Sequence, residues 1–166
     1  WFEEYAITAT KYFGDRVRHW IILNEPLSYT AMGYLLGRHA PGKRGFKNFL
    51  PSVHHSALCQ SEGAKIIRSE VANAQVGTTF NCSVVEPYQN REKDHLAAKK
   101  IDAAFNRLFI EPALGLGYPV SELPELRKLE KYFILAIIRA ESGFDKYAHS
   151  WANAYGLMQI IPKTAN

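Results

Sequence analysis

The chain contains few residues of the kinds that define several protein classes. Two cysteines, Cys59 and Cys82, are too few for a disulfide framework, and their spacing does not match a zinc site, so we expect both to be simply buried. His54 and His55 are adjacent on an expected helix and point in different directions, which argues against a shared metal. We expect neither a metal nor a cofactor.

Long apolar runs and blocks of like charge are also absent from the sequence. No run reaches the roughly 18 apolar residues of a membrane span, and no signal-peptide pattern opens the chain. The 20 basic and 16 acidic residues give a net charge of +4 and lie scattered, which argues against nucleic acid as a partner. Because 47% of the 166 residues are hydrophobic, we expect a packed domain.

Helical and extended patterns alternate along the first two thirds of the chain. Residues 1–13 have helical spacing without an N-cap signal, so the chain looks cut at its start. Residues 17–23 are apolar on both alternating faces, as in a parallel strand that is covered on both sides, and residues 74–81 form a second strand. A helix with proline in its first turn, over residues 51–69, separates the strands, and an amphipathic helix follows over about residues 96–109.

This order of helix, strand, helix, strand and helix predicts the α/β class with a parallel sheet. Periodicity alone leaves open a doubly wound fold and a (β/α) barrel. After about residue 119 the sequence becomes charged and then helical without a further strand. We therefore predict an α/β segment over residues 1–120, a junction over residues 121–132 and a helical segment over residues 133–166.

The block W-I-I-L-N-E-P places Asn24 and Glu25 directly after the first expected strand. Side chains at the carboxyl ends of parallel strands face the open mouth of the sheet, where catalytic groups collect. A carboxylic acid there, beside a side-chain amide and before a rigid proline, suits a general acid that protonates a leaving oxygen. The alternative is that Glu25 simply caps a loop.

A second glutamate, Glu141, follows an apolar helical stretch over residues 134–138. A carboxyl held against that apolar face would be desolvated, which would raise its pKa and keep it protonated near neutral pH, as a single-residue acid/base needs. The alternative is a solvated glutamate at a fraying helix end before Gly143.

Residues 1–120 also contain several motif blocks in a fixed order: F-G-D-R-V-R-x-W-x-x-L-N-E-P, G-Y-x-x-G-x-x-A-P-G, H-H and N-R-x-F-x-x-P followed by G-Y-P. In this order they resemble glycoside hydrolase family 1, the β-glucosidase and 6-phospho-β-glucosidase family. The resemblance implies a TIM barrel in which Glu25 is the acid/base at the end of the fourth strand. It also implies that Asn24 bonds the sugar hydroxyl next to the anomeric carbon.

The sequence departs from that family at the second catalytic group. The family is retaining and uses a second carboxylate as nucleophile, in a T-E-N-G or similar block on the seventh strand. No such block occurs in the 166 residues, and neither Glu86 nor Glu111, each followed by a proline, matches it. The resemblance therefore implies a partial barrel, without the first three and last three strands, that carries an acid without its nucleophile.

Residues 133–166 contain a different signature, the blocks A-I-I-R-A-E-S-G-F and S-W-A-N-A-Y-G-L-M-Q-I-I-P-K-T-A. They resemble the soluble lytic transglycosylases of the lysozyme superfamily. That resemblance implies an α-helical, lysozyme-like fragment in which Glu141 protonates the glycosidic oxygen of peptidoglycan and then acts as base. Ser150 and Gln159 would line the saccharide groove, and Ile161 replaces the family's second methionine.

Three functions remain open: a β-glycosidase-like hydrolase piece, a murein-cleaving lyase piece, and a non-catalytic sugar-binding or remnant chain from a chimeric reading frame. We favour the third for the isolated chain, because catalytic groups must be held to within about half an ångström by a supporting shell. The expected partner is a carbohydrate, either a β-glucoside or a peptidoglycan strand. A half barrel also leaves sheet edges unpaired, so we expect some self-association. The first family is usually cytoplasmic and the second works in the periplasm or cell envelope, so the two halves predict different compartments.

Overall fold

The computed structural model of the chain describes residues 1–129 together with residues 147 and 149. The chain divides into two units, Trp1–Arg127 and Lys128–Asn166. The helical segment expected over residues 133–166 lies almost wholly outside the described residues. The boundaries at residues 120 and 132 therefore stay predictions.

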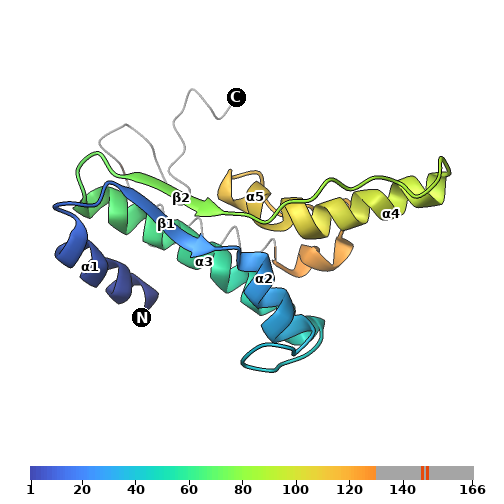
Figure 1. Cartoon of the computed structure of the whole chain (residues 1–166), viewed down its shortest axis with the longest axis horizontal. Helices are drawn as coiled ribbons and strands as arrows, with labels where there is room; N and C mark the ends of the chain where they lie inside the picture. Colours follow the sequence, from blue (N-terminus) through green and yellow to red (C-terminus); the bar gives the residue numbers. More distant parts are fainter. Residues whose placement is uncertain (130–146, 148, 150–166) are drawn as a thin grey trace. The chain divides into compact units, whose positions relative to one another are not determined.

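The first unit is built around two strands joined by one long helix (Figure 1). Strand β1 (His19–Asn24) pairs in parallel with β2 (Gln75–Thr79), and helix α3 (Phe46–Glu70) lies between them in the sequence. The predicted α/β class with two parallel strands and helices is confirmed, since parallel strands require a crossover of this kind. The remaining elements are α1 (Phe2–Phe13), α2 (Pro26–Thr30), the π-helical turns η1 (Ala31–Leu35) and η2 (Ala103–Arg107), α4 (Glu92–Asp102), α5 (Leu108–Ala113) and the short 3-10 turn η3 (Pro124–Leu126).

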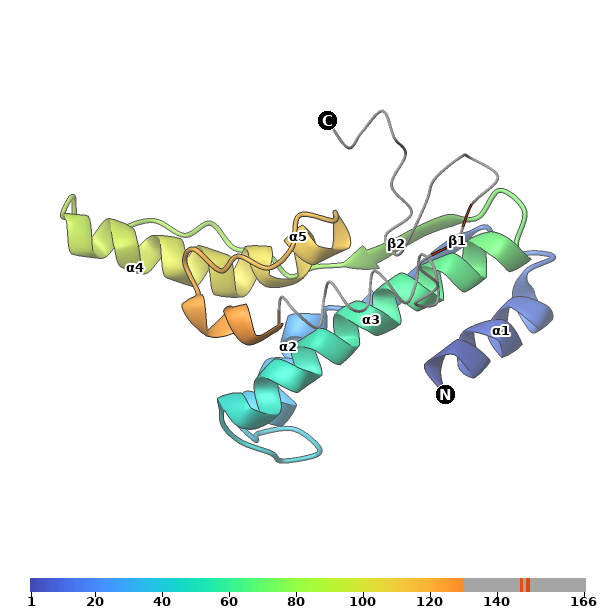
Figure 2. The same cartoon turned by 180° about the vertical axis from the view of Figure 1, so that it is seen from behind.

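Helix α3 lies along the strands and also packs against α1, as both views show (Figures 1 and 2). This close approach depends on Gly63. A Cβ atom added there would lie 3.0 Å from Ile22 Cγ2 of β1 and 3.0 Å from Phe2 Cε1 of α1. The absence of a side chain at one position of α3 therefore lets the helix contact both elements. Val53 and Ile67, on the same helix, are buried.

Strand β1 is covered on one face only by the described elements, whereas the sequence predicted cover on both. Trp20 and Ile22 are half-buried, and Ile22 approaches α3 at Gly63, but Ile21, between them, is 64% exposed. The prediction fails because the part of the chain that the structure describes supplies a helix layer to one side of two strands.

Helix α3 begins five residues before the proline that was expected to start it. Gly45, with φ of 84°, turns the chain into the helix, and its carbonyl accepts the N–H groups of Asn48 and Phe49. The first turn therefore closes before Pro51, which lies inside the helix and lacks only its own N–H donor.

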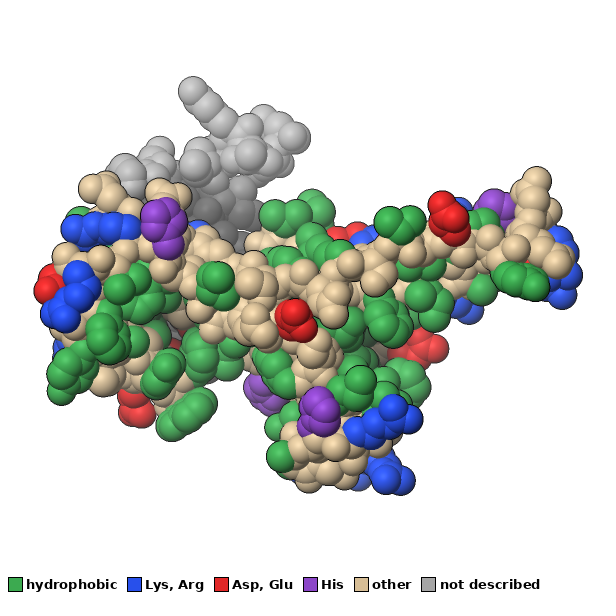
Figure 3. Space-filling view, viewed as in Figure 1, with side chains coloured by type: hydrophobic (Ala, Val, Ile, Leu, Met, Phe, Trp, Pro, Cys, Tyr) green, Lys and Arg blue, Asp and Glu red, His purple; other side chains and the backbone are tan. Residues whose placement is uncertain are grey.

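The helix predicted over residues 96–109 is present and runs from α4 through the π-helical turn η2 into α5, but its first half is exposed. None of the residues of α4 is buried, and Leu96 and Phe105 are 53% and 55% exposed. Burial begins at Ala103 and continues at Leu108. Figure 3 shows hydrophobic side chains along this part of the molecule and over α1.

The cysteines differ from the expectation that both are buried. Cys59, on α3, is half-buried, and Cys82, after β2, is exposed. The exposure follows from the extended course of the chain after β2, which lies outside any regular element. Among the described residues, no helix is long and apolar enough to cross a membrane.

We predict that Gly63→Val lowers the free energy of unfolding by about 1–3 kcal/mol, because the new methyl groups must displace Ile22 and Phe2. Urea unfolding followed by far-UV circular dichroism measures the change. Gly77→Val on β2 is the matched control, since an added Cβ there meets no atom of the described residues within 4 Å. Equal effects of the two substitutions would contradict the packing role of Gly63.

Candidate active site

The two strands leave their regular pairing just before the residues predicted to be functional. Ile21 pairs with Gly77, but Asn24 pairs with Thr79, so β1 advances by three residues while β2 advances by two. An extra residue of this kind re-aims the side chains that follow it. Without it, Asn24 would continue the half-buried series of Trp20 and Ile22, whereas it is exposed.

Glu25 follows with a backbone conformation that is rare outside glycine. Its φ of 43° and ψ of 66° lie in the left-handed region, and Pro26 then occupies the first turn of α2. Such a conformation costs about 1–3 kcal/mol and persists only where the surroundings fix it. Here the Glu25 N–H donates to both the carbonyl oxygen and the Oγ1 of Thr79, at 3.2 and 3.1 Å.

The side chains of Asn24 and Glu25 each have one partner among the described residues. Ser28 Oγ donates to Glu25 Oε2 at 3.0 Å, and Thr79 Oγ1 donates to Asn24 Oδ1 at 2.9 Å. Each interaction occupies one oxygen and leaves other polar atoms of the two side chains for a ligand. The structure thus brings together both site residues predicted from the N-E-P block.

Helix α2, which follows Glu25, is attached to α3 by a side-chain hydrogen bond. Tyr29 Oη donates to Ser56 Oγ at 2.8 Å, and Ser56 Oγ donates in turn to the Ser52 carbonyl. Burial of the Tyr29 phenol raises its pKa, while the Ser56 hydroxyl acts in the opposite direction. Thr30, at the end of α2, is fully buried. The helix that follows Glu25 is therefore packed against the protein and hydrogen-bonded to α3.

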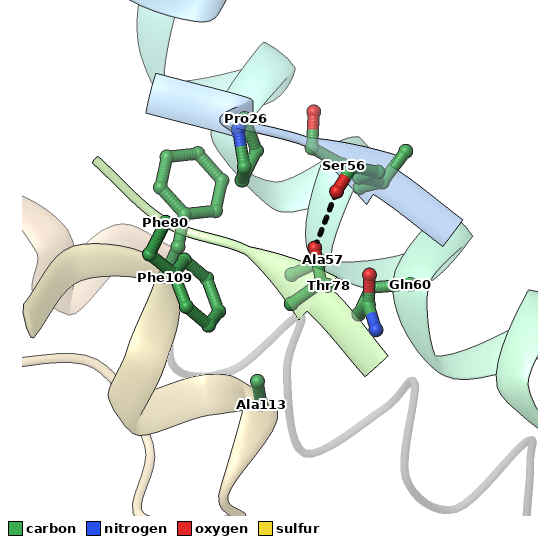
Figure 4. Close-up of a pocket in the computed structure, with 9 residues that line it drawn as sticks. Pro26, Ser56, Ala57, Gln60, Thr78, Phe80, Phe109 and Ala113 are labelled. Atoms are coloured by element: carbon green, nitrogen blue, oxygen red, sulfur yellow. Dashed lines mark hydrogen bonds between the residues drawn. The ribbon is translucent and has the colours of Figure 1, made fainter. Parts of the chain in front are cut away.

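A small, mostly apolar hollow, partly open to solvent, lies beside Pro26 (Figure 4). Two of its lining residues are joined across the strands, because the hydroxyl of Thr78 donates to the Leu23 carbonyl at 2.7 Å. Gln60 Oε1 is buried there and has no hydrogen-bond partner within the described ranges. Its lining is formed by Leu23, Pro26, Ser56, Ala57, Gln60, Thr78, Phe80, Phe109 and Ala113.

The histidine pair lies on α3, with ring centroids 6.1 Å apart. His54 Nδ1 lies 3.2 Å from Tyr118 Oη, and burial, followed by the neighbouring His55, lowers the pKa of His54. Within residues 1–129, 147 and 149 there is no group of three or more histidine, cysteine or acidic side chains that could hold a metal ion.

The other predicted site residues, Glu141, Ser150 and Gln159, lie outside the described residues. Sequence reasoning missed Thr79 and Ser28, which contact the two site residues that are described. A signal for Thr79 was available, because the carboxyl ends of neighbouring parallel strands meet at one edge of a sheet.

The carboxyl group of Glu25 and the amide of Asn24 lie at the carboxyl end of a parallel strand, which is where (β/α) folds commonly carry their catalytic groups. The sequence profile of Glycosyl hydrolase family 1 matches residues 1–145 of the chain. The chain therefore belongs to glycosyl hydrolase family 1, and the resemblance of its motif blocks to that family is confirmed.

Two curated relatives illustrate the extent of the similarity. The 1,4-beta-D-glucan glucohydrolase of Thermotoga neapolitana is 37% identical over 120 residues, which make up 72% of this chain and 28% of that enzyme. The 6-phospho-beta-glucosidase GmuD of Bacillus subtilis is 30% identical over 131 residues, or 79% of this chain and 28% of its own length. The chain thus spans little more than a quarter of these relatives.

Solved structures give the same result. The beta-glucosidase from Thermotoga maritima in complex with glucoimidazole superposes with a TM-score of 0.76 and 32% identity, over 82% of this chain and 32% of that one. The psychrophilic beta-glucosidase BglU from Micrococcus antarcticus gives a TM-score of 0.72 and 35% identity, over 77% and 27% of the two chains. These relatives are TIM barrels, and the first unit corresponds to a part of one.

We predict that the free energy of unfolding falls as pH rises above about 10, because burial raises the pKa of Tyr118. Above the pKa of the unfolded phenol, the unfolded chain loses a proton that the folded chain keeps, so the slope of stability against pH is negative. One such group lowers the free energy of unfolding by up to about 1.4 kcal/mol per pH unit, and Tyr118→Phe should abolish this contribution.

Urea unfolding at pH 9 and pH 11 measures this slope. Tyr88→Phe is the control, since Tyr88 is 88% exposed. If the free energy of unfolding of Tyr118→Phe falls with pH as steeply as that of the control, the Tyr118 phenol has the same pKa in the folded and unfolded chains, and the prediction is wrong.

Proposed function

We propose that the chain carries the acid/base half of a β-glucosidase site. Glu25 protonates the glycosidic oxygen as the aglycone leaves, and Asn24 bonds the sugar hydroxyl next to the anomeric carbon. The observation that supports this proposal is the position of both residues at the tip of β1, held from β2 by Thr79, in a member of family 1. A half-buried carboxyl with one oxygen held by Ser28 can direct its other oxygen toward a ligand.

We infer further that these 166 residues alone bind a β-glucoside without hydrolysing it. Retention requires a nucleophilic carboxylate about 5 Å from the acid, and the sequence contains no match to the family's nucleophile block. Glu111 does not match that block, and its carboxylate forms an ion pair with Arg107. Without the second carboxylate no glycosyl-enzyme intermediate forms.

A chimaera tests the role of Glu25. The 120-residue stretch that aligns with this chain is replaced, in the Thermotoga neapolitana relative, by the corresponding residues of this chain. We expect the chimaera to hydrolyse phenyl β-D-glucoside, and Glu25→Gln to lower kcat by about 10²–10⁴-fold because the leaving oxygen is no longer protonated. Circular dichroism establishes that both proteins fold.

The isolated chain supplies the second comparison. Phenyl β-D-glucoside should bind to it without release of phenol, and Asn24→Ala should weaken binding about tenfold, because a hydrogen bond to the sugar is lost. Titration calorimetry measures binding. A folded chimaera whose activity is insensitive to Glu25→Gln would refute the acid/base assignment, whereas absence of binding to the isolated chain would refute only the second inference.

The sequence blocks over residues 133–166 suggest a second candidate, a lytic transglycosylase-like cleavage of peptidoglycan. The family 1 profile includes Glu141 and ends at residue 145, so of the three predicted residues only Ser150 and Gln159 lie beyond it. In this function Glu141 protonates the glycosidic oxygen, and Ser150 and Gln159 bind the glycan strand. A chimeric reading frame that joins two partial enzymes, without activity in either, is the third alternative.

Murein sacculi incubated with the chain distinguish these alternatives. A transglycosylase releases 1,6-anhydro-muropeptides, which mass spectrometry identifies, and Glu141→Gln abolishes the release because the single acid/base is lost. Glu25→Gln is the matched control and should leave the release unchanged. No anhydro product from the folded wild-type chain would exclude this candidate.

A further inference from the structure

The hydroxyl of Thr79 joins Asn24, the last residue of β1, and Glu25, which follows it, to the neighbouring strand. Thr79 Oγ1 accepts the N–H of Glu25 at 3.1 Å and donates to Asn24 Oδ1 at 2.9 Å. A threonine hydroxyl has one proton to donate and two lone pairs to accept with. In these contacts the proton goes to the amide oxygen of Asn24, and a lone pair receives the amide proton of Glu25.

This arrangement determines which end of the Asn24 amide faces a ligand. Because Oδ1 is occupied by Thr79, the Nδ2 group with its two protons is the end left for the site. An amide presented this way selects an acceptor atom, such as a sugar hydroxyl oxygen. In the opposite orientation Asn24 would offer an acceptor in place of two donors.

The same residue supports the left-handed backbone of Glu25. The Glu25 N–H is shared between the carbonyl oxygen and the hydroxyl of Thr79, directly after the extra residue in β1. A residue with φ of 43° needs such fixed partners. One side chain on β2 therefore influences both the peptide that aims the carboxylate and the amide beside it.

We propose that Thr79 is a positioning residue of the sugar site, which fixes the donor end of Asn24 toward the ligand and holds the Glu25 peptide in its left-handed conformation. The identity of the ligand as a sugar rests on the proposed function. The positioning role concerns the free protein and can be measured without any ligand.

Thr78 offers a matched control on the same strand. Its hydroxyl also crosses to β1, where it donates to the Leu23 carbonyl at 2.7 Å, but it contacts neither Asn24 nor Glu25 in any hydrogen bond of the described residues. Thr78→Val removes one interstrand hydrogen bond and Thr79→Val removes two, in each case with little change in side-chain shape. Only the second should alter the two site residues.

The test uses the ¹⁵N-labelled 166-residue chain and its Thr79→Val, Thr79→Ser and Thr78→Val variants. We expect Thr79→Val to speed hydrogen exchange at the Glu25 amide about fivefold and to move the Asn24 side-chain NH₂ signals, because one hydrogen bond to each is lost. Thr79→Ser keeps the hydroxyl and should restore both to wild-type values. Thr78→Val should leave both unchanged.

Binding of phenyl β-D-glucoside then links position to recognition. Thr79→Val should weaken binding about fivefold to tenfold, and Thr79→Ser should stay within about twofold of wild type. If the wild-type chain does not bind the glucoside, the inference of binding fails while the exchange and NH₂ measurements still decide the role of Thr79.

Two results would overturn the positioning role. The first is that Thr79→Val leaves the Glu25 amide exchange and the Asn24 NH₂ signals as they are in wild type. The second is that Thr78→Val changes both as much as Thr79→Val does. Should Thr79→Val fail to fold, the unmutated chain decides through nuclear Overhauser effects. With Oδ1 on Thr79, the Asn24 Nδ2 protons lie on the side of the amide away from the Thr79 hydroxyl. Strong contacts between those protons and the Thr79 side chain would place the amide the other way round and refute the proposal.

Discussion

The parallel pairing of β1 and β2 is the interaction on which the rest of the first unit depends. It places Asn24 opposite Thr79 and brings the carboxyl ends of both strands to one edge. Helix α3 makes the pairing possible, because its close contact at Gly63 lets one helix cover the strands and α1 together. The site at the strand tips is a consequence of this packing, and α2 extends it by fixing Glu25 from the other side.

Much of this fold could be predicted from the sequence, because the relevant signals are local. Alternation of apolar segments at strand and helix spacing gave the βαβ order, and the N-E-P block at the end of the first strand identified Asn24 and Glu25 as neighbours. The family blocks are equally local, since each is a short run of residue types in a fixed order. These features survive in a single sequence without any knowledge of what packs against them.

The remaining features depend on pairing and packing between distant segments. The extra residue in β1 is a property of its register with β2, so nothing in residues 19–24 alone reveals it. Pro51 was a misleading start signal because the carbonyl of Gly45 closes the first turn earlier. The exposure of Ile21 and of Cys82 depends on which elements pack against them. The residue type alone does not determine whether an apolar or sulfur-containing side chain is buried.

Helix α4 shows a different consequence of missing cover. It has 11 residues and none of them is buried, while an isolated helix of that length is marginal in water. Its persistence therefore depends on its junction with η2, where Asn106 exchanges two hydrogen bonds with Ser83. Such a segment belongs to the low end of the stability range within a protein, so it can melt and re-form while the paired strands and α3 stay intact. Opening of α4 and breakdown of the β1–β2 pair are in that sense separate cooperative events.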